Sequence, residues 1–258
     1  AAWRRAQVDR FIERMYREVH QVKPHVRVGL SPFGLGRPDL RPPTLSGFSQ
    51  YDELYADVER WLACGWLDYL APQLYWRRDT PGRGFLDLLD AWRAADPLAR
   101  PIWPGLFTSQ THTAAAWPAE EILGQIEAAR SRGGALGHLH YSATALMRNR
   151  DGIAERLAEL YGGPALVPAA PWLGGAAPAA PRVRIERGPD LVRLHAEDAG
   201  KLVVWARYGK RWRFLGAMAP GGALPRRATG EDLVELAVSA LGPTGLEGPP
   251  LRLSLEPR

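Results

Sequence analysis

The spacing of apolar residues changes after residue 163, and this change limits the possible folds more than any other feature. Up to that point, apolar residues recur in blocks typical of helices that alternate with buried strands. From residue 182 they recur at every second position, in short runs separated by turn residues. Residues 164–181 are rich in Pro, Ala and Gly, and we interpret them as a linker between two domains of different class.

The first domain, residues 1–163, has the pattern of an α/β fold. We expect helices over residues 3–22, 51–63, 84–95, 118–130 and 151–161, and strands over residues 26–31, 67–75, 102–107 and 135–141. Residues 67–75 are almost continuously apolar, which predicts a strand buried on both faces, as in a parallel sheet. Strands that alternate with helices in this way predict right-handed βα units.

Chain length limits how many βα units can be present. A complete eight-fold (β/α) barrel of the TIM type takes about 250 residues. The whole chain has 258 residues, so it cannot hold such a barrel together with a second domain. The sequence instead predicts four βα units.

The second domain, residues 182–258, has the pattern of a small all-β sandwich. Its alternating runs cover residues 183–185, 191–194, 202–208, 212–215, 233–240 and 251–255. Short alternating strands of this kind are typical of immunoglobulin and fibronectin domains. The loop over residues 241–250 resembles the one before the last strand of a fibronectin type III module.

Composition is that of a globular protein, with 46% apolar and 24% charged residues. No apolar run reaches the ~20 residues of a membrane span. The chain begins without Met, so we expect it to be processed or part of a longer protein. Cys64 is the one cysteine, which excludes an internal disulfide, and it is expected to be a small buried residue.

The charge excess lies in the last third of the chain. Residues 173–258 contain 13 Lys and Arg against 9 Asp and Glu. We interpret this excess as a solvated surface and expect no nucleic-acid partner, although a site for nucleic acid or an anionic polymer stays open as an alternative.

Candidate binding residues follow the predicted parallel strands, because ligands meet such folds at the carboxyl ends of the strands. Gln73 and Tyr75 share a strand face, and Trp76 comes next. Amide, phenol and indole groups suit a polyhydroxylated ligand, although aromatic residues of an ordinary core remain the alternative. His140 is a candidate hydrogen-bond donor to substrate.

Catalytic carboxylates and metal ligands are not evident. Glycoside hydrolysis normally uses a pair of carboxylates, yet Asp68 lies early in its strand, and Asp52 and Glu53 are better explained as the start of a helix. His138 and His140 share a strand face without a third ligand or a carboxylate nearby. We therefore expect neither a metal nor a cofactor.

Three segments resemble the bacterial glycosyl-hydrolase-like family 10 domain, whose members include a divisome-localised peptidoglycan glycosidase. They are Ser31-Pro32-Phe33-Gly34, the run from Tyr51 to Asp57, and the run from Gly65 to Trp76, within a resemblance that covers residues 1–172.

The resemblance implies the C-terminal half of a (β/α) barrel, strands five to eight, from a cell-envelope protein that acts on wall glycan. The family's presumed catalytic aspartates end the fourth barrel strand and have no counterpart in this chain. The residues implied to line the glycan cleft are Ser31, Phe33, Gln73, Tyr75, Trp76 and Tyr141.

Two functions remain open at this stage. The leading hypothesis is a glycosidase of peptidoglycan or a related polysaccharide in the full-length protein, with this chain inactive by itself. The alternative is a protein that binds cell-wall glycan without cleaving it.

Overall fold

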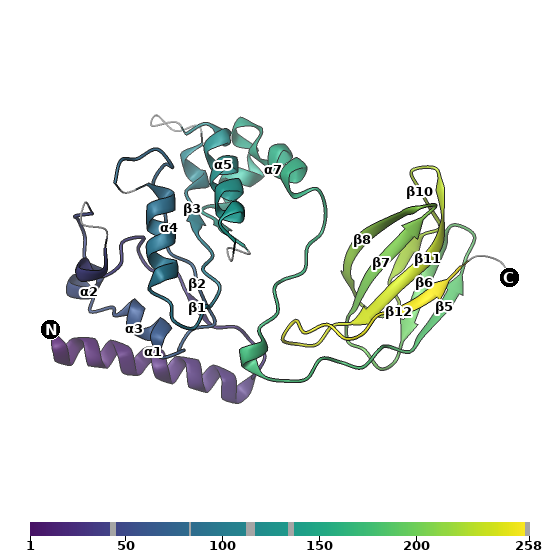
Figure 1. The fold of residues 1–258 in the computed structure, drawn as a ribbon, viewed down its shortest axis with the longest axis horizontal. Helices are drawn as coiled ribbons and strands as arrows, with labels where there is room; N and C mark the ends of the chain where they lie inside the picture. Colours follow the sequence, from purple (N-terminus) through teal and green to yellow (C-terminus); the bar gives the residue numbers. More distant parts are fainter. Residues whose placement is uncertain (42–44, 83, 112–116, 134–136, 256–258) are drawn as a thin grey trace. The chain divides into compact units, whose positions relative to one another are not determined.

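The computed structural model describes residues 1–41, 45–82, 84–111, 117–133 and 137–255. The chain divides into two compact units, Ala1–Leu160 and Tyr161–Arg258 (Figure 1). The first unit mixes helices and strands, and the second is built from strands.

Four short strands of the first unit lie side by side in chain order. They are β1 (Gly29–Leu30), β2 (Tyr69–Leu70), β3 (Gly105–Leu106) and β4 (Leu139–His140). β1 pairs with β2 and β3 with β4, both in parallel, and the parallel bridges Leu70–Ile102 and Gln73–Gly105 join β2 to β3. The predicted parallel pairing is therefore confirmed.

The regular ladders are shorter than the predicted strands because prolines interrupt them. Pro72 and Pro104 lie inside the apolar runs and have no N–H group to donate. Their carbonyl oxygens still accept from the neighbouring strand, at 2.8 Å from the Gly105 N–H and 3.1 Å from the Leu139 N–H. The strands thus stay aligned although only two residues of each form a continuous ladder.

Helices connect the strands. The α-helices are α1 (Ala2–Val22), α2 (Gln50–Glu53), α3 (Val58–Ala63), α4 (Phe85–Ala94), α5 (Ala119–Ser131), α6 (Ala143–Met147) and α7 (Ile153–Tyr161). Single 3₁₀ turns lie at Pro38–Leu40, Thr108–Gln110, Arg150–Gly152 and Pro171–Leu173.

The single helix expected over residues 51–63 is wrong, because the structure has two short helices there. Tyr55 has φ of +58°, which a right-handed helix cannot contain. Ser49 caps α2 by accepting from the Asp52 N–H, and Glu53 accepts from the Ser49 N–H at 3.0 Å. Asp52 and Glu53 therefore lie in the first turn of α2, as expected.

Helices cover only one face of the parallel sheet. On that face, Leu70, Leu74 and Leu106 are fully buried against core residues of the helices, which include Leu62, Leu88, Leu89, Ile122 and Ile126. On the other face, Tyr69 is half-buried and stacks on Trp103 with ring centroids 4.5 Å apart. Ala71 on this face is buried, while Tyr69, Gln73 and Tyr75 are half-buried. The expectation that residues 67–75 are buried on both faces is therefore confirmed only in part.

Asp68 anchors the sheet at the amino end of β2, away from the candidate binding residues. Its carboxylate is fully buried and accepts from the Val28 N–H at 2.8 Å and the Tyr16 hydroxyl at 3.0 Å, while His20 Nε2 lies 3.3 Å away. Burial and this carboxylate raise the pKa of Tyr16 to about 12. Asp68 thus ties α1 to the sheet.

Cys64 was expected to be buried and is exposed instead. It follows the last residue of α3, where Trp61 and Leu62 fill the core while Ala63 and Cys64 face solvent. The apolar run that predicted its burial extends to Cys64, one residue beyond the end of α3.

The second unit consists of two antiparallel sheets. One has the order β5 (Val183–Arg187), β6 (Leu191–Ala196), β9 (Ala223–Pro225). The other has the order β10 (Arg227–Ala228), β11 (Glu231–Ala240), β7 (Leu202–Tyr208), β8 (Arg211–Met218), with β12 (Leu251–Ser254) also paired to β11.

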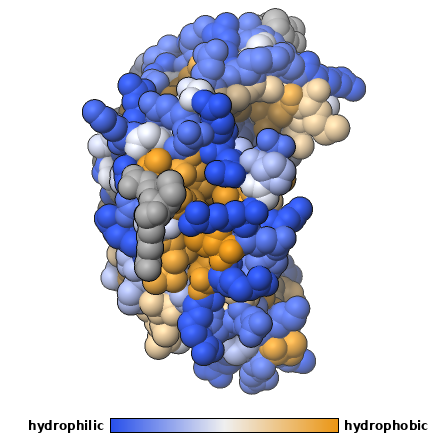
Figure 2. Space-filling view, turned by 90° about the vertical axis from the view of Figure 1, so that its right-hand side faces the viewer, coloured by the Kyte–Doolittle hydropathy of each residue, from blue (hydrophilic) through white to orange (hydrophobic). Residues whose placement is uncertain are grey.

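Side chains from both sheets form the core of this unit, among them Leu194, Leu224, Val204 and Leu236. All six predicted runs are strands, and the sequence analysis missed β9 and β10, which lie in a stretch rich in Gly, Pro and Arg. Figure 2 shows the face at the right of Figure 1, where hydrophobic side chains gather in a central band bordered by hydrophilic ones.

The segment expected to be a linker touches the second unit. Ala170 is fully buried, and its N–H donates to the Thr244 carbonyl at 2.8 Å. Across the described residues, no helix combines the length and apolarity that crossing a membrane requires.

Candidate functional site at the carboxyl ends of the strands

The parallel pairing brings the residues that follow each strand to one edge of the sheet. Phe33 bridges to Gln73, and the Gln73 side-chain amide donates to the Ser31 carbonyl at 3.1 Å. Ser31 and Phe33 are exposed there. Residues from the first two strand ends therefore meet, as the sequence predicts.

An aromatic cluster, defined as Tyr75, Phe107 and Tyr141, occupies this edge. Tyr75 stacks on Phe107 with centroids 4.5 Å apart and on Tyr141 at 5.6 Å, while Phe107 and Tyr141 are 6.0 Å apart. Trp117 meets the edge of Phe107 at 6.1 Å. Since Tyr141 remains 54% exposed, the cluster presents aromatic surface to solvent.

The phenol of Tyr75 stays protonated at neutral pH. Burial, with a smaller contribution from Tyr141, raises its pKa above the usual value. A protonated phenol both donates and accepts a hydrogen bond. Together with the Gln73 amide it offers polar groups beside the stacked rings.

His140 has a fixed orientation on the other side of the sheet from the aromatic cluster, because its register partner Leu106 points to the helix-covered face. Its Nδ1 is 2.7 Å from the Thr108 hydroxyl, and the Thr108 side chain is fully buried. The ring meets His138 edge to face at 5.0 Å, so the two histidines share a strand face as predicted. Burial lowers the pKa of each histidine to about 4, so both rings are neutral at pH 7.

Because burial lowers the pKa of both histidines, we expect the folded chain to be less stable in acid. Their pKa is about 6.5 when unfolded and about 4 when folded, so between these values the unfolded chain binds the extra protons. The free energy of unfolding should therefore fall as the pH drops from 6.5 to 4, and it should be unaffected by these groups above 6.5. Urea denaturation of the wild type and of His138→Gln at pH 7.0 and 5.0 measures this.

The variant should lose less stability than the wild type over this interval, because one titrating group is gone. His25→Gln, at an exposed position, is the matched control and should keep the wild-type pH dependence. A wild-type slope in His138→Gln would contradict the assignment.

Not all predicted residues join the aromatic cluster. Trp76 is half-buried and packs against the core on the helix side, and its carbonyl accepts from the Gln125 amide at 3.0 Å. The ring of Phe33 pairs with Phe48, 4.7 Å away. The structure thus brings Gln73, Tyr75 and Tyr141 to one face of the sheet. It places His140 on the opposite face and gives Trp76 a packing role.

Phe107 and Thr108 were not named as candidate residues in the sequence analysis. Both directly follow β3, at the strand end where ligand-binding residues are expected. That position is the signal that identifies Phe107. The contact of Thr108 with His140 joins residues 32 positions apart, and no local pattern reveals it.

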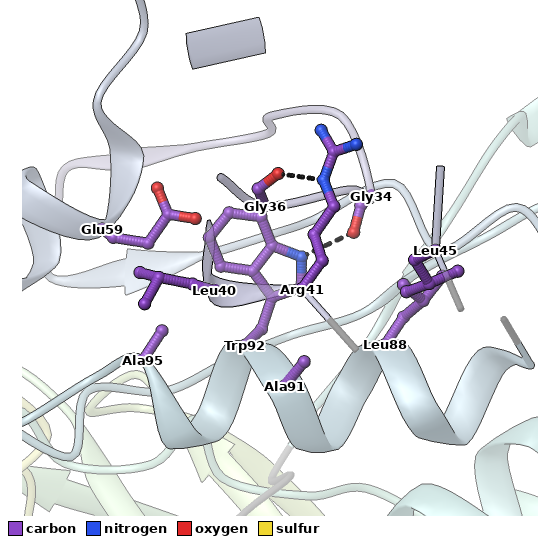
Figure 3. Close-up of a pocket in the computed structure, with 10 residues that line it drawn as sticks. All are labelled: Gly34, Gly36, Leu40, Arg41, Leu45, Glu59, Leu88, Ala91, Trp92 and Ala95. Atoms are coloured by element: carbon purple, nitrogen blue, oxygen red, sulfur yellow. Dashed lines mark hydrogen bonds between the residues drawn. The ribbon is translucent and has the colours of Figure 1, made fainter. Parts of the chain in front are cut away.

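A small crevice lies beneath the loop over residues 34–50 (Figure 3). Its volume is about 20 Å³, room for about one water molecule and too little for a sugar ring. Trp92 Nε1 donates to the Gly34 carbonyl at 2.8 Å, and Arg41 donates to the Gly36, Gly47 and Phe48 carbonyls. These contacts hold the loop in place.

Glu59 lines the same crevice and is 7% exposed. It accepts from the Arg37 N–H at 2.6 Å, and burial raises its pKa above the usual value. The crevice therefore supports the loop that carries Phe48, and a glycan would bind elsewhere.

None of the residues described directly after β1 to β4 is a carboxylate. Within the described parts of the chain, no group of three His, Cys, Asp or Glu residues is placed to hold a metal ion. Residue 112, a further histidine of the sequence, lies outside the described residues. The site as described can bind and orient a ligand, and it offers no acid and base pair.

Comparison with known proteins gives consistent relatives. The glycosyl hydrolase-like 10 family matches residues 1–117. Glycosyl hydrolase YngK of Bacillus subtilis (strain 168) is 34% identical over 191 residues, which make up 70% of this chain and 37% of YngK. Glycosyl hydrolase DigH of Escherichia coli (strain K12) is 38% identical over 97 residues, which make up 36% of this chain and 22% of DigH.

The chain thus spans well under half the length of these two curated relatives. The matched residues include β1, β2, β3 and the strand-end residues Gln73, Tyr75 and Phe107. Residues 1–117 therefore match the glycosyl hydrolase-like 10 family.

Proposed function

We propose that the first unit is the C-terminal half of a (β/α) barrel, strands five to eight. Three observations support this architecture: the strands are parallel, they follow chain order, and helices cover one face only. Within the described residues, β1 and β4 each pair on one side, which leaves an edge for further strands. In a closed barrel the half-buried face with Tyr69 and Trp103 would point inward.

The complete protein is proposed to hydrolyse the glycan of the bacterial cell wall, peptidoglycan or a related polysaccharide, in the cell envelope. The observation that carries this proposal is the aromatic cluster beside Gln73. Sugar rings have apolar faces that stack on aromatic rings and hydroxyl edges that need donors and acceptors. The match of residues 1–117 to the family gives the reaction class.

In this mechanism the described residues bind and orient the sugar while the acid comes from elsewhere. Tyr75, Phe107 and Tyr141 would stack on a sugar ring, and the Gln73 amide would bind its hydroxyls. The carboxylates that glycoside hydrolysis requires would end barrel strands outside residues 1–258.

Peptide-free glycan strands test the proposal. The 258-residue chain should bind them without releasing reducing ends, and the full-length protein that contains it should release them. Full-length protein that binds the strands but releases no reducing ends would overturn hydrolysis.

That outcome would favour the second candidate, a protein that binds wall glycan without cleaving it. The observation that favours this candidate is the lack of a carboxylate among the residues described after β1 to β4.

The second unit is proposed to be a fibronectin type III-like module. Supporting this, β5, β6 and β9 form one sheet and β8, β7, β11 and β12 form the other, with a shared core.

A further inference from the structure

The outer face of the five-stranded sheet in the second unit carries exposed aromatic side chains. Residues of β7 that point into the sandwich core alternate with Trp205 and Arg207, which point away from it. On β8, Phe214 is the register partner of Trp205, and Trp212 is the partner of Arg207. We call Trp205, Trp212, Phe214, Arg207, Glu235 and Arg252 the sheet platform.

The aromatic rings of the sheet platform lie close together and remain accessible. Trp205 is 43% exposed and Trp212 is 36% exposed. Trp205 contacts Phe214 with centroids 5.0 Å apart. Trp205 and Trp212 are diagonal neighbours on adjacent strands, a spacing of about 7–8 Å between Cα atoms. Two indoles at this spacing can contact successive parts of one extended ligand.

Charged groups cross the same face. Arg207 pairs with Glu235 at 2.9 Å, and Arg252 reaches the other oxygen of Glu235 at 3.3 Å. The guanidinium of Arg252 also lies over the ring of Trp212, 5.6 Å from its centroid. Two arginines therefore share one carboxylate, and Arg252 keeps 71% of its side chain exposed.

Part of the remaining outer face is covered. Val203 is fully buried and Ser239 is 2% exposed, although both lie on the outer side of the sheet. Ser239 donates to Glu247 in the loop before β12. The exposed rings are thus a local feature of the uncovered half of the sheet.

We propose that the sheet platform binds a polysaccharide whose sugars carry carboxylate groups, as a second glycan site apart from the strand-end site. Flat aromatic rings suit sugar faces, and the positive excess of two arginines over one glutamate suits a carboxylate on the sugar. The net positive charge of residues 173–258 acts in the same direction. Arg252 is the group expected to pair with the ligand, because it is the most exposed of the three charged side chains.

The affinity of the chain for two different glycans tests this proposal. The probes are peptide-free glycan strands, in which every second sugar carries a carboxylate, and chitin hexasaccharide, which carries none. All measurements use the whole 258-residue chain in a Tyr75→Ala background, so that the strand-end site contributes little.

Trp205→Ala with Trp212→Ala should weaken binding to the carboxylated strands by about tenfold or more. Arg252→Gln should reduce binding to the carboxylated strands, weaken its dependence on salt, and leave binding to chitin hexasaccharide unchanged. Phe11→Ala, at a position 65% exposed in α1 of the first unit, is the matched control and should bind as the background does.

Wild-type affinity in the double tryptophan variant would overturn the proposal. The proposal would also be overturned if the wild-type chain self-associates and the double tryptophan variant does not. The sheet platform would then be an interface between copies of this chain. If the double variant fails to fold, Arg252→Gln decides, since its exposed side chain is not part of a core. Binding at the strand-end site is weakened in the Tyr75→Ala background. A negative result for the sheet platform can therefore be distinguished from a negative result for the proposed function, which concerns the strand-end site.

Discussion

Replacing Tyr75 by alanine in the 258-residue chain is expected to weaken binding to peptide-free glycan strands at the strand-end site by about 30-fold, or about 2 kcal/mol. Tyr75 stacks on both Phe107 and Tyr141, so its loss removes one ring and leaves the other two without their common partner. Calorimetric titration in a Trp205→Ala, Trp212→Ala background isolates this site.

Tyr75→Phe separates the two roles of the side chain. It keeps the ring stack and removes the phenol, so affinity should fall only by the few-fold effect of one hydrogen bond. Phe11→Ala again serves as the control for loss of an exposed aromatic residue. Unchanged binding in Tyr75→Ala, with an intact circular dichroism spectrum, would show that the aromatic cluster is only packing.

Replacing Asp68 by alanine is expected to destabilise the first unit by about 3–5 kcal/mol. The change leaves the Val28 N–H and the Tyr16 hydroxyl without their acceptor in a buried site, and it removes the carboxylate that lies 3.3 Å from His20 Nε2. Urea unfolding followed by tryptophan fluorescence measures the loss. Since the two units can unfold separately, the transition of the second unit is an internal reference and should not move.

Asp90→Ala is the matched control for Asp68→Ala. Asp90 pairs with Arg132 at 2.9 Å but its side chain is 50% exposed, so the loss should stay within about 1 kcal/mol. Equal destabilisation by both changes would contradict the view that Asp68 is a buried anchor.

The spacing of apolar residues predicted the helices and the parallel pairing, because both place apolar side chains in the core. It did not predict the break at Tyr55, since a left-handed residue leaves the apolar spacing of residues 51–63 almost unchanged. The burial of Cys64 was predicted wrongly for a different reason. The apolar run continues to Cys64, but the helix α3 ends at Ala63, so Cys64 is not on the buried face of a helix.

The rule that ligands bind at the carboxyl ends of parallel strands predicted where the candidate site lies. It correctly grouped Gln73, Tyr75 and Tyr141 because parallel strands bring their carboxyl ends to one edge. It could not separate Trp76 from them, since adjacent residues on a strand point to opposite faces and the turn after Tyr75 decides where the indole packs.

The sequence by itself determined the order of elements, the change from helical to alternating spacing, and the family that residues 1–117 match. These are properties of neighbouring residues along the chain. Only the tertiary structure decided that Tyr75, Phe107 and Tyr141 stack, that Asp68 closes the opposite end of the sheet, and that Arg252 lies over Trp212. Each of these contacts joins residues more than 30 positions apart in the chain. Whether such side chains touch depends on how the helices and strands pack against one another, which local sequence patterns do not specify.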